Sequence, residues 1–276
     1  MSMLMNISGN VLVGLQYYLV SNPSILNFRY TPNQTFGGTL LFLASTIVLY
    51  LSTTFLFHVQ IIPTPSLHPS TLRNLSTLHN ILILLLSLVM SIGCAISSLT
   101  QIPSYAQLFC FPPVTTTSSG PVFFWAYVFY LSKIYEFVDT VLIILNKSKK
   151  LSFLHVYHHA MVVVMCYVWL ETSQSLIPIA LVTNASVHVL MYAYYLCSSL
   201  GWRWSVGWKR VVTNVQIFQF GFSFMVSLVL LWMHFRHGGC SGMGGWTFNA
   251  VFNASLFVLF LDFHRKSYGM KKKKKK

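Results

Sequence analysis

The chain has 276 residues, of which 55% are hydrophobic and only 8% are charged, and its formal net charge is +14. Soluble domains carry about 25% charged residues, and disordered chains are far less apolar, so the composition excludes both classes and predicts a polytopic membrane protein. A lysine run at residues 271–276 supplies part of the charge and few other basic residues interrupt the apolar stretches, which indicates membrane topology rather than nucleic-acid binding.

Seven apolar stretches are long enough to cross the hydrocarbon core as helices, which takes about 20 residues. In chain order they cover residues 39–61, 78–99, 121–145, 154–170, 175–199, 211–235 and 245–263. Only a few residues around Glu171 separate the fourth from the fifth, which indicates a tight helical hairpin. No internal repeat is visible, so we expect residues 1–276 to form one all-α, membrane-embedded domain with seven transmembrane helices.

Positive charge alternates between the loops and sets the expected orientation. Lysine and arginine gather after the first, third, fifth and seventh stretches, whereas the loops on the other side carry few. We therefore expect a lysine-rich cytosolic tail at 264–276 and a short N-terminal segment, residues 1–36, on the opposite, lumenal side.

Two cysteines on the non-cytosolic side are expected to pair. Cys110 and Cys240 fall in different loops there, where disulfides persist, although two unrelated thiols are the alternative. No C-x-x-C motif occurs, so a zinc or redox site is not expected. Asn6 and Asn33 lie in N-x-S/T sequons on the same side and could be glycosylated.

Four consecutive stretches, from the third to the sixth, carry polar side chains at helical spacing on one face. Such groups are costly inside a membrane and usually serve function. At 1.5 Å per residue, all of them fall in the cytosolic half, so we expect them to converge on one site. In chain order they are Lys133, Glu136, Asp139 and Thr140; His155, His158 and His159; Asn184, His188, Tyr192 and Tyr195; Thr213, Gln216 and Gln219.

Simpler explanations exist for some of these residues. Lys133 and Glu136 could form a buried ion pair with a purely structural role, and the glutamines could join helices by hydrogen bonds. The H-x-x-H-H box at 155–159 also occurs in membrane di-iron oxidases, but those need about eight histidines in several boxes, and here only one box exists. The remaining histidines are scattered through the chain: His58, His68, His79, His234, His237 and His264. A seven-span receptor or transporter is a further alternative.

The polar set favours acyl transfer over metal chemistry. A neutral imidazole can attack a thioester, and a dry pocket would protect the resulting acyl-imidazole. The amides of Asn184, Gln216 and Gln219 could stabilise a developing negative charge, and Asp139 could orient a histidine ring. The other half of the bundle would form an apolar tube, in which each buried CH₂ gains about 0.8 kcal/mol. Four cations of the cytosolic loops could bind phosphates or could simply signal topology: Arg203, Lys209, Arg210 and Lys266.

Together the four motifs resemble those of the ELO family of very-long-chain fatty acid elongases. The matching patterns, in family order, are K-x-x-E-x-x-D-T at 133–140, H-x-x-H-H at 155–159, N-x-x-x-H-x-x-M-Y-x-Y-Y at 184–195 and T-x-x-Q-x-x-Q at 213–219. The last stretch departs from the family pattern L-F-x-x-F-Y, because His264 stands where tyrosine is usual. That departure places the expected contacts between this edge and coenzyme A in doubt.

The resemblance implies a 3-ketoacyl-CoA synthase, an acyltransferase of the endoplasmic reticulum that condenses a long acyl-CoA with malonyl-CoA. It also implies that spans two to seven form a six-helix barrel around an acyl tunnel. By the same resemblance His158 is the nucleophile, His188 assists decarboxylation or proton transfer, and His155 and His159 orient the pair. No metal or other cofactor is expected. Expected partners are the bilayer, the two CoA substrates and the other elongation enzymes: a ketoreductase, a dehydratase and an enoyl reductase. Self-association stays open.

Overall fold

The computed structural model describes residues 13–146, 151–202 and 204–268, and most of these residues are helical. Within these ranges there is no strand, only one isolated β-bridge between Arg29 and Ser119. The N-terminal part contains the short elements η1 (Tyr17–Ser21) and α2 (Pro23–Leu26), and η2 (Tyr105–Leu108) lies in the loop after the second predicted span. Asn6 and the lysine run of the tail lie outside the described residues.

Six of the helices are long and apolar enough to cross a membrane. They are α3 (Leu40–His58), α4 (Pro69–Gln101), α7 (Phe153–Glu171), α8 (Ile177–Ser199), α9 (Val206–Arg236) and α10 (Met243–Tyr268). The protein is therefore a multi-pass, all-helical membrane protein. The predicted positions hold well, but α4 begins nine residues earlier than expected, because Pro69 starts the helix and His68 caps it by accepting from the Ser70 N–H.

The third predicted span is not one continuous helix. It consists of α5 (Pro121–Tyr135) and α6 (Phe137–Leu145), which meet at Glu136. Neither piece is long enough to cross the hydrocarbon core by itself. The expectation of one continuous helix through residues 133 to 140 is therefore wrong, since α5 ends at Tyr135 and α6 begins at Phe137.

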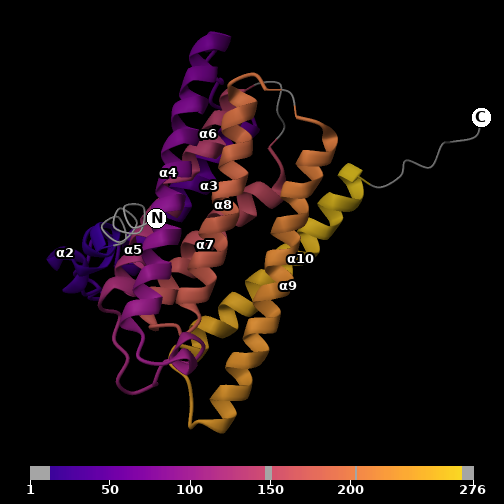
Figure 1. Cartoon of the computed structure of the whole chain (residues 1–276). Coiled ribbons are helices and arrows are strands. Elements are labelled where there is room, and N and C mark those ends of the chain that lie inside the picture. Colours follow the sequence, from indigo (N-terminus) through magenta and orange to yellow (C-terminus); the bar gives the residue numbers. More distant parts are fainter. Residues whose placement is uncertain (1–12, 147–150, 203, 269–276) are drawn as a thin grey trace, which may run out of the picture.

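The helices contact one another in a closed circuit. Along the circuit α4 packs on α8, α8 on α9, α9 on α10, α10 on α7, α7 on α5, and α5 on α4. The helix α3 lies outside this circuit, against α6 and α7. Figure 1 shows α9 and α10, in orange and yellow, along one edge of the bundle. Helices that are neighbours in the circuit run in opposite directions, so the loops gather at the two ends of the bundle.

The N-terminal segment is fastened to the bundle by hydrogen bonds from aromatic side chains. The Tyr30 hydroxyl donates to the Glu171 carboxylate at 2.7 Å, and the Tyr130 hydroxyl donates to the Gly37 carbonyl at 3.0 Å. Burial, and then the bond to Glu171, raise the pKa of Tyr30, so this phenol stays protonated and remains a donor. The segment thereby covers the outer side of α5 and α7.

A glycine allows the close packing of α4 on α5. A Cβ atom added at Gly93 would overlap the indole ring of Trp125, which is buried. Small residues at such contacts let two membrane helices approach closely. We expect Gly93→Ala to lower the free energy of unfolding by about 1–3 kcal/mol, because the rigid indole must shift.

Thermal unfolding of the purified protein in detergent checks this expectation, with Gly221→Ala as the matched control. Gly221 also lies inside a long helix, but a Cβ atom there meets nothing within 4 Å. The control variant should be as stable as the parent, or slightly more stable because alanine favours helix. Equal melting temperatures for the two variants would contradict the packing argument.

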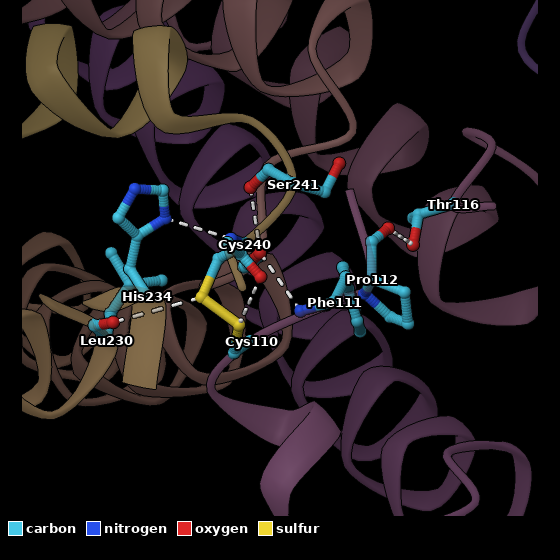
Figure 2. The surroundings of a disulfide bond; sticks show 10 residues. Cys110, Phe111, Pro112, Thr116, Leu230, His234, Cys240 and Ser241 are labelled. Atoms are coloured by element: carbon cyan, nitrogen blue, oxygen red, sulfur yellow. Dashed lines mark hydrogen bonds between the residues drawn. A yellow bond between two sulfur atoms is a disulfide. The ribbon is translucent and has the colours of Figure 1, made fainter. Parts of the chain in front are cut away.

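One end of the bundle is closed by a disulfide between Cys110 and Cys240, the pairing expected from the sequence. Figure 2 shows how hydrogen bonds join the surrounding loops. The Ser241 N–H donates to the Phe111 carbonyl at 2.8 Å, and the Ser175 hydroxyl donates to the Ser241 carbonyl at 2.8 Å. Three separate loops are therefore tied together at what we call the disulfide end.

Loss of this bond should destabilise the fold. The two cysteines are 130 residues apart in sequence, so the link removes much freedom from the unfolded chain. We expect the double change Cys110→Ser with Cys240→Ser to cost about 2–4 kcal/mol of unfolding free energy. Melting curves with and without a reductant measure it. The reductant should lower the melting temperature of the parent and of Cys197→Ser, which lacks only a free thiol, but leave the double variant unchanged.

Candidate active site

A cavity of about 910 Å³ opens at the end of the bundle opposite the disulfide. Its mouth lies between the loops that join α3 to α4, α6 to α7 and α8 to α9, where the exposed side chains of Arg73 and Lys209 line it. Deeper in the bundle the cavity is lined by His158 and His188, which come from α7 and α8. The two histidines thus face one shared space.

The histidine box occupies the first turns of α7. The helix begins there because Ser152 caps it, accepting a hydrogen bond from the His155 N–H at 3.2 Å. The ring centroid of His159 lies 4.2 Å from that of His155 and 5.5 Å from that of His158. His155 is held from α6, because its Nε2 lies 2.8 Å from the Thr140 hydroxyl. Thr140 in turn contacts the Tyr50 hydroxyl of α3 at 3.0 Å, so three helices fix the box.

His188 is in contact with a buried ion pair at the break between α5 and α6. The Lys133 Nζ lies 2.8 Å from the Glu136 Oε1 and 3.4 Å from both ring nitrogens of His188. The His188 Nδ1 lies 3.6 Å from the same carboxylate oxygen. All three side chains are buried, with 0%, 1% and 6% of Lys133, Glu136 and His188 exposed. The ion pair therefore does more than join two turns of the chain, since it also contacts a histidine of the cavity.

Asp139 orients a histidine as expected, but not one of the box. Its Oδ1 lies 3.0 Å from the Nε2 of His79 on α4, and its Oδ2 accepts from the Tyr192 hydroxyl at 2.5 Å. His79 is only 3% exposed and its ring lies beside that of Tyr135. The sequence placed His79 among scattered histidines, which is wrong. A signal was present in the sequence, since His79 and Asn80 are adjacent polar residues inside an apolar stretch. In the structure Asn80 lines the cavity.

The predicted amides reach the cavity, with different partners. Asn184, Gln216 and Gln219 all line it, and the Asn184 Oδ1 is buried without a hydrogen-bond partner. The Gln216 Nε2 donates to the sulfur of Met191 at 3.3 Å. The Thr213 hydroxyl instead bonds to the Lys209 carbonyl and lies 3.3 Å from the Tyr268 hydroxyl, so it joins α9 to α10. Asn184 thus places an amide oxygen without a partner at the cavity wall.

Of the four cations proposed from the sequence, the three that the structure describes do not gather at the cavity. Lys209 lines the mouth of the cavity, whereas Arg210 and Lys266 do not. Lys266 pairs with Asp262 at 2.7 Å on the exposed side of α10, one helical turn away. Arg203 lies outside the described residues. Arg73, read from the sequence only as a topology signal, lines the mouth instead.

A second, narrow cavity continues from the first toward the disulfide end. The two cavities share the lining residues His158, Asn184, Gln219 and Phe220. The second then runs between α7, α8, α9 and α10 to Trp169, Leu176 and Asn249. In the described part of the chain, no three His, Cys, Asp or Glu side chains are arranged to hold a metal ion. The geometry therefore offers a deep histidine pair with a cationic mouth on one side and a narrow, mostly apolar channel on the other.

Comparison with known proteins gives a consistent assignment. The family model described as "ELO: GNS1/SUR4 family" matches residues 35–276. The chain is 29% identical over 264 residues to "Fatty acid elongase 3-like" of Arabidopsis thaliana, covering 91% of this chain and 90% of the relative. It is 35% identical to "Fatty acid elongase sre1" of Dictyostelium discoideum, covering 78% and 77% of the two chains. It is 33% identical to "Fatty acid elongase A" of the same organism, covering 74% and 76%. The chain belongs to the ELO (GNS1/SUR4) family.

Proposed function

We propose that this protein is a fatty acid elongase of the 3-ketoacyl-CoA synthase type. It condenses a long acyl-CoA with malonyl-CoA and releases CO₂ and coenzyme A. The observation that carries the proposal is the shared cavity of His158 and His188, which has a cationic mouth and continues into a narrow channel. The names of the related proteins, all fatty acid elongases, agree with this reading.

In the first step His158 receives the acyl group. One ring nitrogen attacks the carbonyl carbon of the thioester and the carbon–sulfur bond breaks. The proton lost from the other ring nitrogen goes to the sulfur, so coenzyme A leaves as a thiol. The acyl-imidazole that remains is sensitive to water, and its place deep in the bundle protects it. Asn184, whose amide faces the same space, is positioned to donate to the oxygen on which negative charge develops.

In the second step malonyl-CoA supplies two carbons. Its terminal carboxylate leaves as CO₂, and the electron pair of the broken bond forms an enolate that attacks the acyl carbon. The bond to His158 then breaks, which restores the imidazole and gives a 3-ketoacyl-CoA longer by two carbons. His188 faces the reacting carbon, held by Lys133 and Glu136, and serves the proton transfers of this step.

The channel is the place of the acyl chain. The closed circuit of α4, α8, α9, α10, α7 and α5 then forms a six-helix barrel, in which α5 and α6 together make one crossing, and α3 outside the circuit is the seventh span. Each CH₂ buried in the channel contributes about 0.8 kcal/mol to binding. Coenzyme A stays at the mouth, where Lys209 and Arg73 meet its phosphates.

The loop charges and the disulfide support an orientation, and membership of the elongase family supports a location in the endoplasmic reticulum. The mouth faces the cytosol, where both CoA substrates occur, and the disulfide end and the N-terminal segment face the lumen of the endoplasmic reticulum, where disulfides persist. The reaction uses no metal or other cofactor, since histidine, amide and carboxylate groups supply its nucleophile, proton transfers and charge stabilisation. The product then requires a ketoreductase, a dehydratase and an enoyl reductase, which are the expected partners in the membrane.

An elongation assay tests the proposal directly. Microsomes that contain the full chain are given labelled malonyl-CoA and a series of saturated and unsaturated acyl-CoAs. We expect labelled 3-ketoacyl-CoA, two carbons longer than the substrate, for a limited range of chain lengths. The absence of labelled product at every chain length, with folded protein in the membrane, would favour a receptor or transporter function instead.

A further inference from the structure

The part of the second cavity that lies away from His158 is unexpectedly polar for a channel that holds hydrocarbon. Trp169 of α7 and Asn249 of α10 both line the cavity and are only 2% and 3% exposed. The Trp169 Nε1 and the Asn249 Oδ1 are buried without any hydrogen-bond partner. We call these two side chains the Trp169–Asn249 pair.

Farther from His158, two other polar side chains of the same cavity wall, Thr183 and Asn253, are hydrogen-bonded within the protein. The Thr183 hydroxyl donates to the Ile179 carbonyl of its own helix at 2.8 Å. The Asn253 amide donates to the Ser223 hydroxyl at 3.1 Å and so joins α10 to α9. A buried polar group without a partner is costly, and native proteins keep few of them. The two orphan atoms therefore call for a ligand rather than a packing explanation.

The chemistry of the two atoms is complementary to a hydroxyl group. An indole N–H can only donate a hydrogen bond, and an amide oxygen can only accept one. A hydroxyl accepts from the first and donates to the second, whereas a terminal methyl group can do neither. A buried water molecule and a hydroxyl at the end of an acyl chain share this chemistry.

The position of the pair relative to His158 fits the second of these sources. Trp169 follows His158 by 11 residues on α7, which corresponds to about 16 Å along the helix axis. This inference rests on the proposed function: an acyl group attached to His158 and lying in the second cavity extends toward the pair. We propose that the Trp169–Asn249 pair is a hydroxyl-binding site that recognises an acyl chain with a hydroxyl group at its far end.

Paired substrates test the proposal on the purified full chain. Acyl-CoAs with a methyl end and with an ω-hydroxyl end are compared at each chain length, with labelled malonyl-CoA as the second substrate. We expect the hydroxylated chain to be favoured about fivefold to tenfold in kcat/KM, the worth of one net hydrogen bond, at the one length that reaches the pair. At shorter lengths the preference should vanish.

Three variants locate the preference. The measured quantity is the ratio of the rates with the ω-hydroxyl and the methyl-ended acyl-CoA within each variant. A general loss of activity lowers both rates and leaves this ratio unchanged. Asn249→Leu removes the acceptor, Trp169→Phe removes the donor, and each should bring the ratio at the favoured length close to one. Thr183→Val is the matched control, because it removes a hydroxyl of the same cavity that is already bonded, and it should keep the parental ratio.

The outcomes separate this inference from the proposed function. Equal rates for both substrates at every chain length would overturn the inference, since the pair would then hold only a buried water. A preference that persists in both Asn249→Leu and Trp169→Phe would also overturn it. Failure to elongate any substrate, methyl-ended chains included, would instead count against the elongase function itself.

Discussion

The change His158→Ala should abolish elongation while leaving the protein folded. If His158 carries the acyl group, its loss removes the covalent route, and we expect kcat to fall by at least about 10³-fold. The ring lines both cavities and its Nδ1 has no hydrogen-bond partner, so its removal breaks no bond that holds the fold. Labelled malonyl-CoA incorporation measures the rate, and a melting curve in detergent checks folding.

A control and an intermediate trap sharpen this test. His237→Ala removes an exposed histidine at the disulfide end and should keep the parental rate. Incubation of the parent with acyl-CoA alone, followed by denaturation and mass spectrometry, should show one acyl mass on the peptide that contains residues 155–159. Turnover by His158→Ala at a rate near that of the parent, or an acyl mass on another peptide, contradicts the assigned nucleophile.

Much of this site was predictable because helical spacing is a local property. The offsets within 155–159 and 184–195 place histidines on one face of each helix. The positive charge of the loops gives the direction of each span, and so predicts that these histidines lie at similar depth in the membrane. The structure brings His158 and His188 to one cavity as that argument requires. The pairing of Cys110 with Cys240 followed in the same way, from two loops on one side of the membrane.

The contacts that were missed depend on how helices rotate and tilt against their neighbours. His79 belongs to α4, and only the packing of α4 beside α6 and α8 brings its ring to Asp139 and Tyr192. Likewise, Lys209 and Lys266 both lie among the basic residues on the predicted cytosolic side. Lys266 nevertheless pairs with Asp262 on the exposed face of α10 and does not line the mouth. Periodicity assigns a residue to a face of its own helix but does not say which neighbour that face meets.

The break at Glu136 was also invisible to periodicity, because the apolar pattern continues through it. At this position the side chain meets buried partners on the preceding turn and on α8. The carboxylate reaches both Lys133 and His188, so the same residue ends α5, precedes α6 and contacts the candidate catalytic histidine. Fold and chemistry are therefore coupled at this position, and the two can be separated by substitution.

Lys133→Met and Glu136→Leu should each destabilise the protein strongly, whereas the double variant should regain most of the lost stability. Each single change leaves one charge buried without its partner, which costs about 3–5 kcal/mol of unfolding free energy. Replacing both charges by apolar side chains of similar size is often neutral, since the cost of burying the charges disappears as well. Melting curves of the four proteins in detergent give the coupling energy between the two positions.

The elongation assay on the same four proteins gives the decisive contrast. The double variant should remain inactive despite its recovered stability, because His188 has lost both groups that lie within 3.6 Å of its ring. Asp262→Asn is the matched control for stability: it removes the partner of an exposed ion pair and should change the unfolding free energy by less than about 1 kcal/mol. An active double variant would show that the pair serves the fold alone, and a double variant as unstable as either single one would show that the two charges do not compensate each other.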